Sequence, residues 1–113
     1  MSQPPIKFCP QCGSFAITQW LDGLDRVQCG VSCGYVHWDN PTPVVAAIVE
    51  YEGQVLLARN AQWPEGWFAL ITGFLEKGES PEQSVIREVK EELNLEGVIT
   101  EFVGNYSFYQ ANQ

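Results

Sequence analysis

Residues 73–95 read GFLEKGESPEQSVIREVKEELNL, a glycine-bounded loop that leads into a strongly charged segment with helical signals. Ser80 is a typical helix N-cap residue, Pro81 suits the first helical position, and Gln83 can complete a capping box. Asn94 tolerates the left-handed backbone conformation that ends many helices. This stretch therefore predicts a helix that begins at Pro81 and ends just before Asn94.

Three glutamates of this helix, Glu88, Glu91 and Glu92, should crowd one side of it. At about 100° per residue they lie within roughly a quarter turn, where like charges repel. A divalent cation would relieve the repulsion. Oxygen ligands favour Mg²⁺ or Mn²⁺, and Mg²⁺ commonly accompanies a phosphate-bearing substrate. The alternative is a solvated acidic face. Arg87 is placed to pair with Glu91 or with Glu79 of the preceding loop.

The same segment resembles the Nudix box. In this motif a glycine, a loop glutamate, an Arg-Glu pair, a Glu-Glu pair and aliphatic residues occur at fixed spacing. The matching residues are Gly73, Glu79, Arg87, Glu88, Val89, Glu91, Glu92 and Leu95. The late glycine of the box is Asn94 here, which is a mild replacement where a positive φ is needed. The resemblance implies Mg²⁺-dependent hydrolysis of a nucleoside diphosphate linked to another moiety.

The resemblance also implies roles for individual residues. Glu88 and Glu92 would be metal ligands, with Glu91 close by and the carbonyl of Gly73 helping. The loop glutamate of the box would brace Arg87. Family members differ in the general base of the reaction, so Glu91 is only one candidate for it.

Four cysteines precede the box as two pairs, Cys9 with Cys12 and Cys29 with Cys33, separated by 16 residues. This spacing predicts a tetrahedral Cys₄ zinc site in a ribbon of short strands. A glycine follows the second cysteine of each pair, where a tight knuckle needs a residue without a side chain. All four thiols would be used, so the zinc would be structural. The alternatives are two disulfides or unrelated core thiols, and no signal peptide precedes the pairs to favour disulfides.

Composition limits the size and the partners of the protein. A chain of 113 residues with 45% hydrophobic content can form one small core and one metal-stapled appendage. The net charge is −8, and the first 41 residues carry two basic against three acidic side chains. The ribbon therefore lacks the basic surface that nucleic acid binding requires. No apolar run approaches the ~20 residues that span a bilayer. We expect a soluble, cytoplasmic protein that binds a small-molecule nucleotide.

The pattern along the chain predicts an α+β fold. Residues 1–41 would form the zinc ribbon, and residues 42–113 a Nudix domain with a mixed β-sheet and the box helix. An apolar stripe on the helix should pack on the sheet; it consists of Val85, Ile86, Val89 and Leu93. The expected strands cover residues 15–20, 26–29, 34–38, 44–50, 54–59 and 70–72, with one long or bent strand over 98–109.

A Nudix domain typically continues with further strands and a second helix, whereas this sequence ends about 18 residues after the box. We therefore expect the domain to be incomplete as it stands. An uncovered sheet edge and an uncovered apolar helix face predict a homodimer or poor stability.

The substrate can be narrowed only by closer resemblance. The ribbon, the Asp39-Asn-Pro linker and LITGFLEKGE at 70–79 are similar to zinc-ribbon Nudix enzymes that cleave NADH, ADP-ribose or FAD. The Ser-Gln-Pro-Trp motif of NADH pyrophosphatases is absent after the box, so NADH preference stays open. Trp67 is a candidate for stacking on a substrate base, although such aromatics more often pack in loops. His37, the sole histidine, has the pattern of a strand residue.

Two other function classes remain at this stage. A non-catalytic nucleotide sensor could keep the fold, but the complete set of box carboxylates argues against it. An enzyme that removes an NAD cap from RNA is the other alternative, and the acidic ribbon argues against it.

Overall fold

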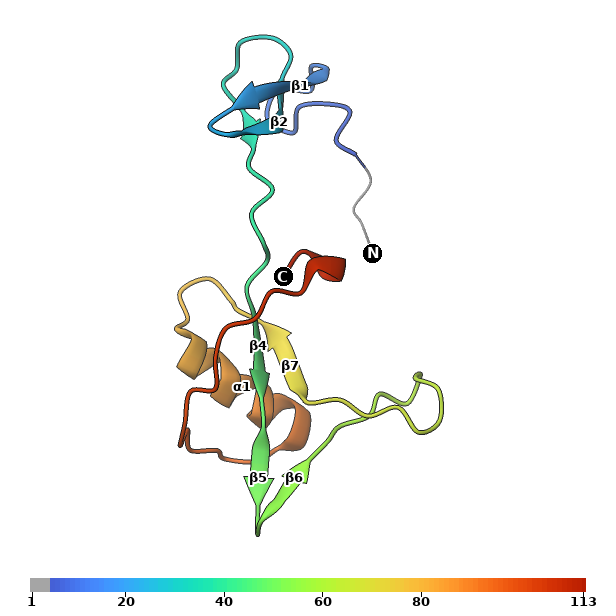
Figure 1. Cartoon of the computed structure of the whole chain (residues 1–113), viewed down its shortest axis with the longest axis vertical. Coiled ribbons are helices and arrows are strands. Elements are labelled where there is room, and N and C mark those ends of the chain that lie inside the picture. Colours follow the sequence, from blue (N-terminus) through green and yellow to red (C-terminus); the bar gives the residue numbers. More distant parts are fainter. Residues whose placement is uncertain (1–4) are drawn as a thin grey trace. The chain divides into compact units, whose positions relative to one another are not determined.

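The computed structural model describes residues 5–113, which form two compact units (Figure 1). The first unit extends to Pro41 and includes Phe108–Asn112, and the second consists of Thr42–Ser107 with Gln113. The elements in chain order are β1 (Ala16–Leu21), β2 (Leu24–Cys29), β3 (Val36–His37), β4 (Val44–Ala47), β5 (Val49–Tyr51), β6 (Gln54–Leu56), β7 (Ile71–Phe74), the helix α1 (Pro81–Leu93) and a 3₁₀ turn, η1 (Tyr109–Ala111).

The first unit is a three-stranded antiparallel ribbon with the strand order β1-β2-β3. Its side chains reinforce the backbone pairing at Arg26 of β2. Arg26 donates hydrogen bonds to the carbonyls of Leu21 (3.1 Å) and Trp38 (3.0 Å), and its guanidinium lies 5.0 Å from the centre of the Trp38 ring. These contacts tie the ends of β1 and β3 to β2. The small ribbon expected from the cysteine spacing is confirmed.

The second unit contains two short antiparallel pairs, β4 with β7 and β5 with β6. Its extended run over 44–51 changes partner at Ile48, so the strand expected at 44–50 exists in two pieces. The sequence predicts an extended backbone for this run. The point at which the run divides into β4 and β5 depends on which strands lie beside it. Every strand pair within residues 5–113 is antiparallel.

The box helix runs over Pro81–Leu93, as predicted, and both of its ends are capped as the sequence indicated. The Ser80 hydroxyl accepts a hydrogen bond from the Gln83 backbone N–H (3.2 Å), and the Gln83 side chain accepts one from the Ser80 backbone N–H (2.9 Å). Asn94 ends the helix with a φ of 54°, and its N–H donates to the carbonyl of Lys90. The α+β class is confirmed.

The core of the second unit lies where α1 packs on β7 and β4 (Figure 1). Ile71 and Val89 are buried there, together with Ser84. Of the expected apolar stripe, Ile86 faces solvent to a larger extent than Val89 does. This interface fixes the box helix against the strand that leads into the box loop.

The strand expected over 98–109 is wrong. The structure gives residues 98–108 no regular secondary structure, and η1 follows them. A strand needs the backbone hydrogen bonds of a neighbour, and none of the described strands pairs with this segment. Its large apolar side chains remain exposed, among them Val98, Phe102, Val103, Tyr106 and Tyr109.

No helix within residues 5–113 has the length and apolar content needed to cross a membrane.

Candidate functional site

The site begins where β7 meets the box helix. Gly73 lies in β7, paired with Val45 of β4, and the carboxylate of Glu88 in α1 lies against it. A Cβ atom at position 73 would overlap the carboxylate carbon and both carboxylate oxygens of Glu88. The Glu88 side chain is only 12% exposed. The first glycine of the box is therefore needed for close approach, since any larger residue would displace this carboxylate.

Arg87 is the centre of the box contacts. Its Nε donates to Glu79 Oε1 at 2.6 Å, and its Nη1 donates to Glu88 Oε1 at 2.9 Å and to Glu91 Oε2 at 3.1 Å. Its Nη2 donates to the carbonyl of Phe74 at 3.2 Å. One guanidinium thus connects the box loop, β7 and three glutamates. The sequence predicted that Arg87 pairs with Glu91 or with Glu79, and the structure shows both pairs.

Ser84 belongs to this network, and the sequence reading missed it. Its side chain is fully buried, and its hydroxyl lies 3.5 Å from the carbonyl of Phe74 and 3.4 Å from Arg87 Nη2. The signal was present in the sequence, because Ser84 lies one turn before Arg87 and Glu88 on the inner side of the helix. A polar residue on that side has to find a buried partner.

The electrostatics of the site follow from these contacts. The hydrogen bonds that Arg87 donates hold the pKa of Glu79 below its ordinary value, and the same bonds, accepted by Glu79, Glu91 and Glu88, raise the pKa of Arg87. Partial burial raises the pKa of Glu92, and the negative charges of Glu88 and Glu91 raise it further. The negative charge of Glu92 is thus disfavoured by the neighbouring carboxylates, and a bound cation would relieve this repulsion.

The box glutamates do not all converge on one point. Within residues 5–113, the ligand atoms that gather within 4.8 Å of one another belong to the four cysteines, and the three helix glutamates form no such group. Arg87 holds Glu88 and Glu91 by ion pairs, whereas Glu92 is not among its partners. Glu88 lies beside Gly73, but Glu88 and Glu91 are both engaged by the arginine.

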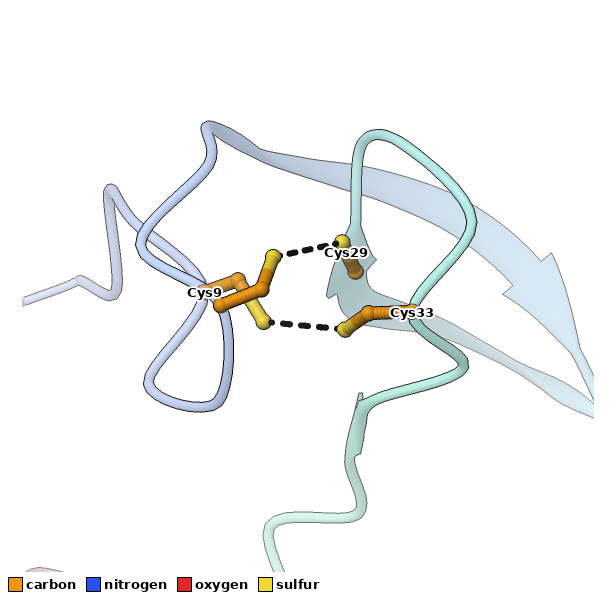
Figure 2. A group of neighbouring side chains, drawn as sticks. Cys9, Cys29 and Cys33 are labelled. Carbon is orange, nitrogen blue, oxygen red and sulfur yellow. Dashed lines mark hydrogen bonds between the residues drawn. The ribbon is translucent and has the colours of Figure 1, made fainter.

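The second site is the cysteine cluster of the ribbon (Figure 2). Figure 2 shows Cys9 on one loop facing Cys29, at the end of β2, and Cys33, on the loop that follows β2. The sulfur of Cys9 lies 3.4 Å from that of Cys33, and the sulfur of Cys12 lies 3.6 Å from that of Cys29. These distances are far longer than a disulfide bond of about 2.05 Å, and all four cysteines are free thiols.

The thiols fit a tetrahedral metal ion. A Zn–S distance of about 2.3 Å places the four sulfur atoms about 3.8 Å apart, and the sulfur atoms here lie within 4.8 Å of one another. Gly13 and Gly34, which follow the second cysteine of each pair, have φ values of 78° and 86°. The Gly13 N–H donates to the carbonyl of Cys9 at 2.9 Å and closes the first knuckle.

The thiols have unequal acidities. Hydrogen bonding by Ser14 lowers the pKa of Cys12 to about 6. For Cys33, the Tyr35 N–H lowers the pKa, but partial burial and the neighbouring thiols outweigh it and raise the value to about 12. Four thiolates cannot share so small a volume without a cation to balance them.

The remaining candidates lie elsewhere. Trp67 is mostly exposed and lines a hollow with neighbouring loop residues. His37 lies in β3, as its pattern indicated, with its Nε2 3.6 Å from a carboxylate oxygen of Asp39. It is not part of the cysteine cluster.

Comparison with known proteins agrees with this geometry. The model of the NUDIX domain family matches residues 40–113, which include β4, β7 and the whole box helix.

The chain belongs to the Nudix hydrolase family.

Curated relatives of this Nudix chain carry the name NAD-capped RNA hydrolase NudC. The protein from Pseudomonas aeruginosa is 33% identical over 102 residues, covering 90% of this chain and 36% of its own length. The one from Vibrio cholerae is 38% identical over 95 residues, covering 84% of this chain and 34% of its own length. The chain thus spans about a third of the length of the curated relatives it matches.

A solved structure gives the same fold. The crystal structure of a NUDIX hydrolase from Nitrosomonas europaea matches with a TM-score of 0.64 and 39% sequence identity. The match covers 75% of this chain and 49% of that chain. The Nudix-type fold expected from the box is confirmed.

Proposed function

We propose that this Nudix chain is a Mg²⁺-dependent or Mn²⁺-dependent pyrophosphohydrolase that acts on nucleoside diphosphates linked to another moiety. Water would attack one phosphorus atom of the diphosphate, and the bridging P–O bond would break. The products would be a nucleoside monophosphate and a second phosphate monoester. The observation that carries the proposal is the contact between Glu88 and Gly73, since it brings a box carboxylate against the strand that leads into the loop.

The residues that would hold the divalent metal are Glu88 and Glu92, with Glu91 and the carbonyl of Gly73 beside them. Their donor atoms are all oxygens, the ligands that Mg²⁺ and Mn²⁺ prefer. The raised pKa of Glu92, caused by partial burial and by the charges of the other two glutamates, also fits a cation site. When bound, the metal would neutralise the diphosphate and lower the pKa of the attacking water.

Arg87 and Glu79 would act as positioning residues. The 2.6 Å contact between them anchors the guanidinium to the box loop. The other arm of Arg87 holds the carboxylate of Glu88 beside Gly73. Because Arg87 also pairs with Glu91, that glutamate would have to leave the arginine before it could serve as a ligand or a general base.

The substrate class that we propose is a dinucleotide or nucleotide sugar such as ADP-ribose, NAD(H) or FAD. All of these share a diphosphate joined to a nucleoside, which is the group that the box carboxylates would address. Removal of an NAD cap from RNA is a second candidate, and the names of the curated relatives favour it. The net charge of −8 does not favour an RNA substrate. The complete set of box glutamates argues against a non-catalytic sensor.

We propose a structural zinc ion for the ribbon, held by Cys9, Cys12, Cys29 and Cys33. All four thiols would be used, so no coordination position would remain open for chemistry. The division into a ribbon over 1–41 and a Nudix domain over 42–113, the homodimer and the cytoplasmic location stay predictions.

The test is an assay of the purified chain with Mg²⁺ against ADP-ribose, NADH, FAD, ATP and an RNA oligonucleotide with a 5′ NAD cap. A phosphatase-coupled readout detects the phosphate monoesters. We expect Mg²⁺-dependent cleavage of at least one diphosphate-linked substrate, and a loss of about 100-fold or more in Glu88→Gln, since even outer-shell changes at metal sites cost 10–100-fold.

The matched control is Glu82→Gln, an exposed glutamate in the first turn of the same helix. It should keep nearly normal turnover. Turnover by Glu88→Gln close to that of the unmodified chain would remove Glu88 from the ligand set.

A further inference from the structure

The segment between β6 and β7 is a loop with a closed stem (Figure 1). Ala58 and Ala69 form an antiparallel bridge, and each N–H donates to the other residue's carbonyl, at 2.8 and 2.9 Å. Inside the stem, Arg59 Nη2 donates to the carbonyl of Trp63 at 3.0 Å. The loop is thus closed at its base by the Ala58–Ala69 bridge, and the Arg59 hydrogen bond holds it a second time inside the stem.

Two turns shape the tip of this loop. The Trp63 N–H donates to the carbonyl of Asn60 at 3.0 Å, and the Trp67 N–H donates to the carbonyl of Pro64 at 3.2 Å. Gly66 lies inside the second turn with a φ of 84°, and a Cβ there would meet open space. The turns therefore place two tryptophans on one short loop with an unobstructed gap beside them.

That gap is a hollow of about 440 Å³, within the range of about 300–1,000 Å³ that small-molecule sites occupy. Its lining residues are Trp63, Gly66, Trp67, Phe68 and Ala69. Trp67 is 64% exposed and Phe68 is 59% exposed. Three large aromatic side chains in six consecutive residues, with such exposure, indicate a surface that binds a partner.

The loop leads directly into β7, the strand of the proposed diphosphate site. Ala69, at the stem, is followed by β7 (Ile71–Phe74), which contains Gly73. Gly73 comes four positions after Ala69, which is about 13 Å along an extended chain. The aromatic hollow and the proposed diphosphate site thus belong to one continuous segment, with the hollow on the N-terminal side.

We infer that this aromatic hollow binds a planar heteroaromatic ring of the substrate, an inference that rests on the proposed hydrolysis of a nucleoside diphosphate. The ring would stack on Trp67, with Phe68 and Trp63 beside it. Aromatic side chains stack on any base, because every base presents a π-face. The hollow would therefore favour substrates in which a ring is joined to the diphosphate, and would not select among rings by hydrogen bonding.

The experiment compares Trp67→Leu with Trp20→Leu, each as the full chain. Leucine keeps an apolar side chain but removes the ring. Trp20 is the matched control, since it is 72% exposed and lies in β1 of the ribbon unit. Both variants and the unmodified chain are titrated with AMP, nicotinamide mononucleotide and ribose 5-phosphate without metal, and binding is read by tryptophan fluorescence. Steady-state hydrolysis of ADP-ribose and NADH is measured with Mg²⁺.

We expect AMP or nicotinamide mononucleotide to quench the fluorescence of the unmodified chain and of Trp20→Leu, and ribose 5-phosphate not to do so. Because Trp67 is itself a reporter, binding is compared by the midpoint of the quenching that Trp63 still reports, and this midpoint should move to a higher ligand concentration in Trp67→Leu. The KM should rise by about 10-fold, given the stacking contribution per base, with kcat nearly unchanged, as for a contact made equally in the ground and transition states.

The two probes identify the source of the ring. A loss for AMP, ADP-ribose and NADH, but not for nicotinamide mononucleotide, assigns the hollow to adenine. A loss confined to nicotinamide mononucleotide and NADH assigns it to the nicotinamide ring. Equal quenching midpoints and equal KM in Trp67→Leu and the unmodified chain would overturn the inference. If no substrate is cleaved by any form, the proposed function fails, while the fluorescence titration still decides whether the hollow binds a ring.

Discussion

Replacing Gly73 with alanine is the sharpest test of the geometry at the box. The added methyl would overlap the Glu88 carboxylate, which has to retreat. The backbone can accept alanine, because Gly73 has no positive φ and keeps its place opposite Val45 in the β4–β7 pair. The clash falls on the flexible end of a side chain, so the change should move the carboxylate and leave the fold in place.

The expected loss follows from the size of that movement. The carboxylate has to shift by about 1 Å or more to restore ordinary contact, and a misplacement of about 1 Å can cost 10²-fold in rate. We therefore expect kcat/KM for the preferred substrate to fall by about 100-fold, equivalent to about 2.7 kcal/mol of transition-state stabilisation. Combining Gly73→Ala with Glu88→Asp shortens the side chain by one methylene and should restore part of the activity.

The assay is steady-state hydrolysis with Mg²⁺, with thermal unfolding measured in parallel. Gly97→Ala is the matched control: it lies in the same unit, and a Cβ there would make only an ordinary contact of 3.9 Å with Val89. It should keep both activity and stability. A folded Gly73→Ala variant with kcat/KM within about twofold of the unmodified chain would refute the argument, since a difference of 1.4 kcal/mol already corresponds to tenfold.

Three further predictions concern stability and zinc. Arg87 lowers the pKa of Glu79 below its ordinary value of 4.5. The ionised Glu79 carboxylate therefore stabilises the fold fully above pH 4.5, and this stabilisation is lost as the pH falls through the lowered pKa. The difference in unfolding free energy between the unmodified chain and Glu79→Gln should therefore shrink on acidification, and a constant difference would contradict this. Cys12→Ser should reduce bound zinc from about one ion per chain to nearly none, measured by elemental analysis, because a Cys₄ site needs all four thiolates; full occupancy would exclude this cysteine as a ligand. Asn94→Gly should raise the unfolding free energy by about 0.5 kcal/mol, because Asn94 has a φ of 54°; a lower midpoint in denaturant would count against that reasoning.

The helix of the box could be predicted to the residue because its signals are local. Ser80, Pro81 and Gln83 act within one turn, and Asn94 ends the helix by its own backbone preference. The same is true of the cysteine pairs, whose spacing is set by two knuckles. In each case the residues that decide the structure lie close together in the sequence.

The strands were harder to predict than the helix, because each strand depends on a neighbouring strand that the local sequence does not identify. The run over 44–51 is extended as expected, but its partner changes at Ile48 from β7 to β6. Residues 98–109 have enough apolar side chains for a strand, yet no described strand pairs with them. Pattern alone could not reveal either outcome.

The candidate site shows the same division. The pairing of Arg87 with Glu79 and Glu91 follows from helical spacing and from the nearby loop. The contact of Glu88 with Gly73 and the burial of Ser84 arise where α1 packs on β7, which is a tertiary contact. A resemblance can suggest which residues act together, but the close approach that makes Gly73 necessary is visible only in three dimensions.

The most direct test of the account is Mn²⁺ binding measured by electron paramagnetic resonance, because only free Mn²⁺ gives the strong solution signal. The unmodified chain, saturated with zinc, should reduce that signal in a titration. Glu88→Gln and Glu92→Gln should bind far more weakly, while Glu82→Gln should behave as the unmodified chain does. Equal Mn²⁺ binding by all four proteins would contradict the central claim that Glu88, beside Gly73, and Glu92 hold the divalent metal.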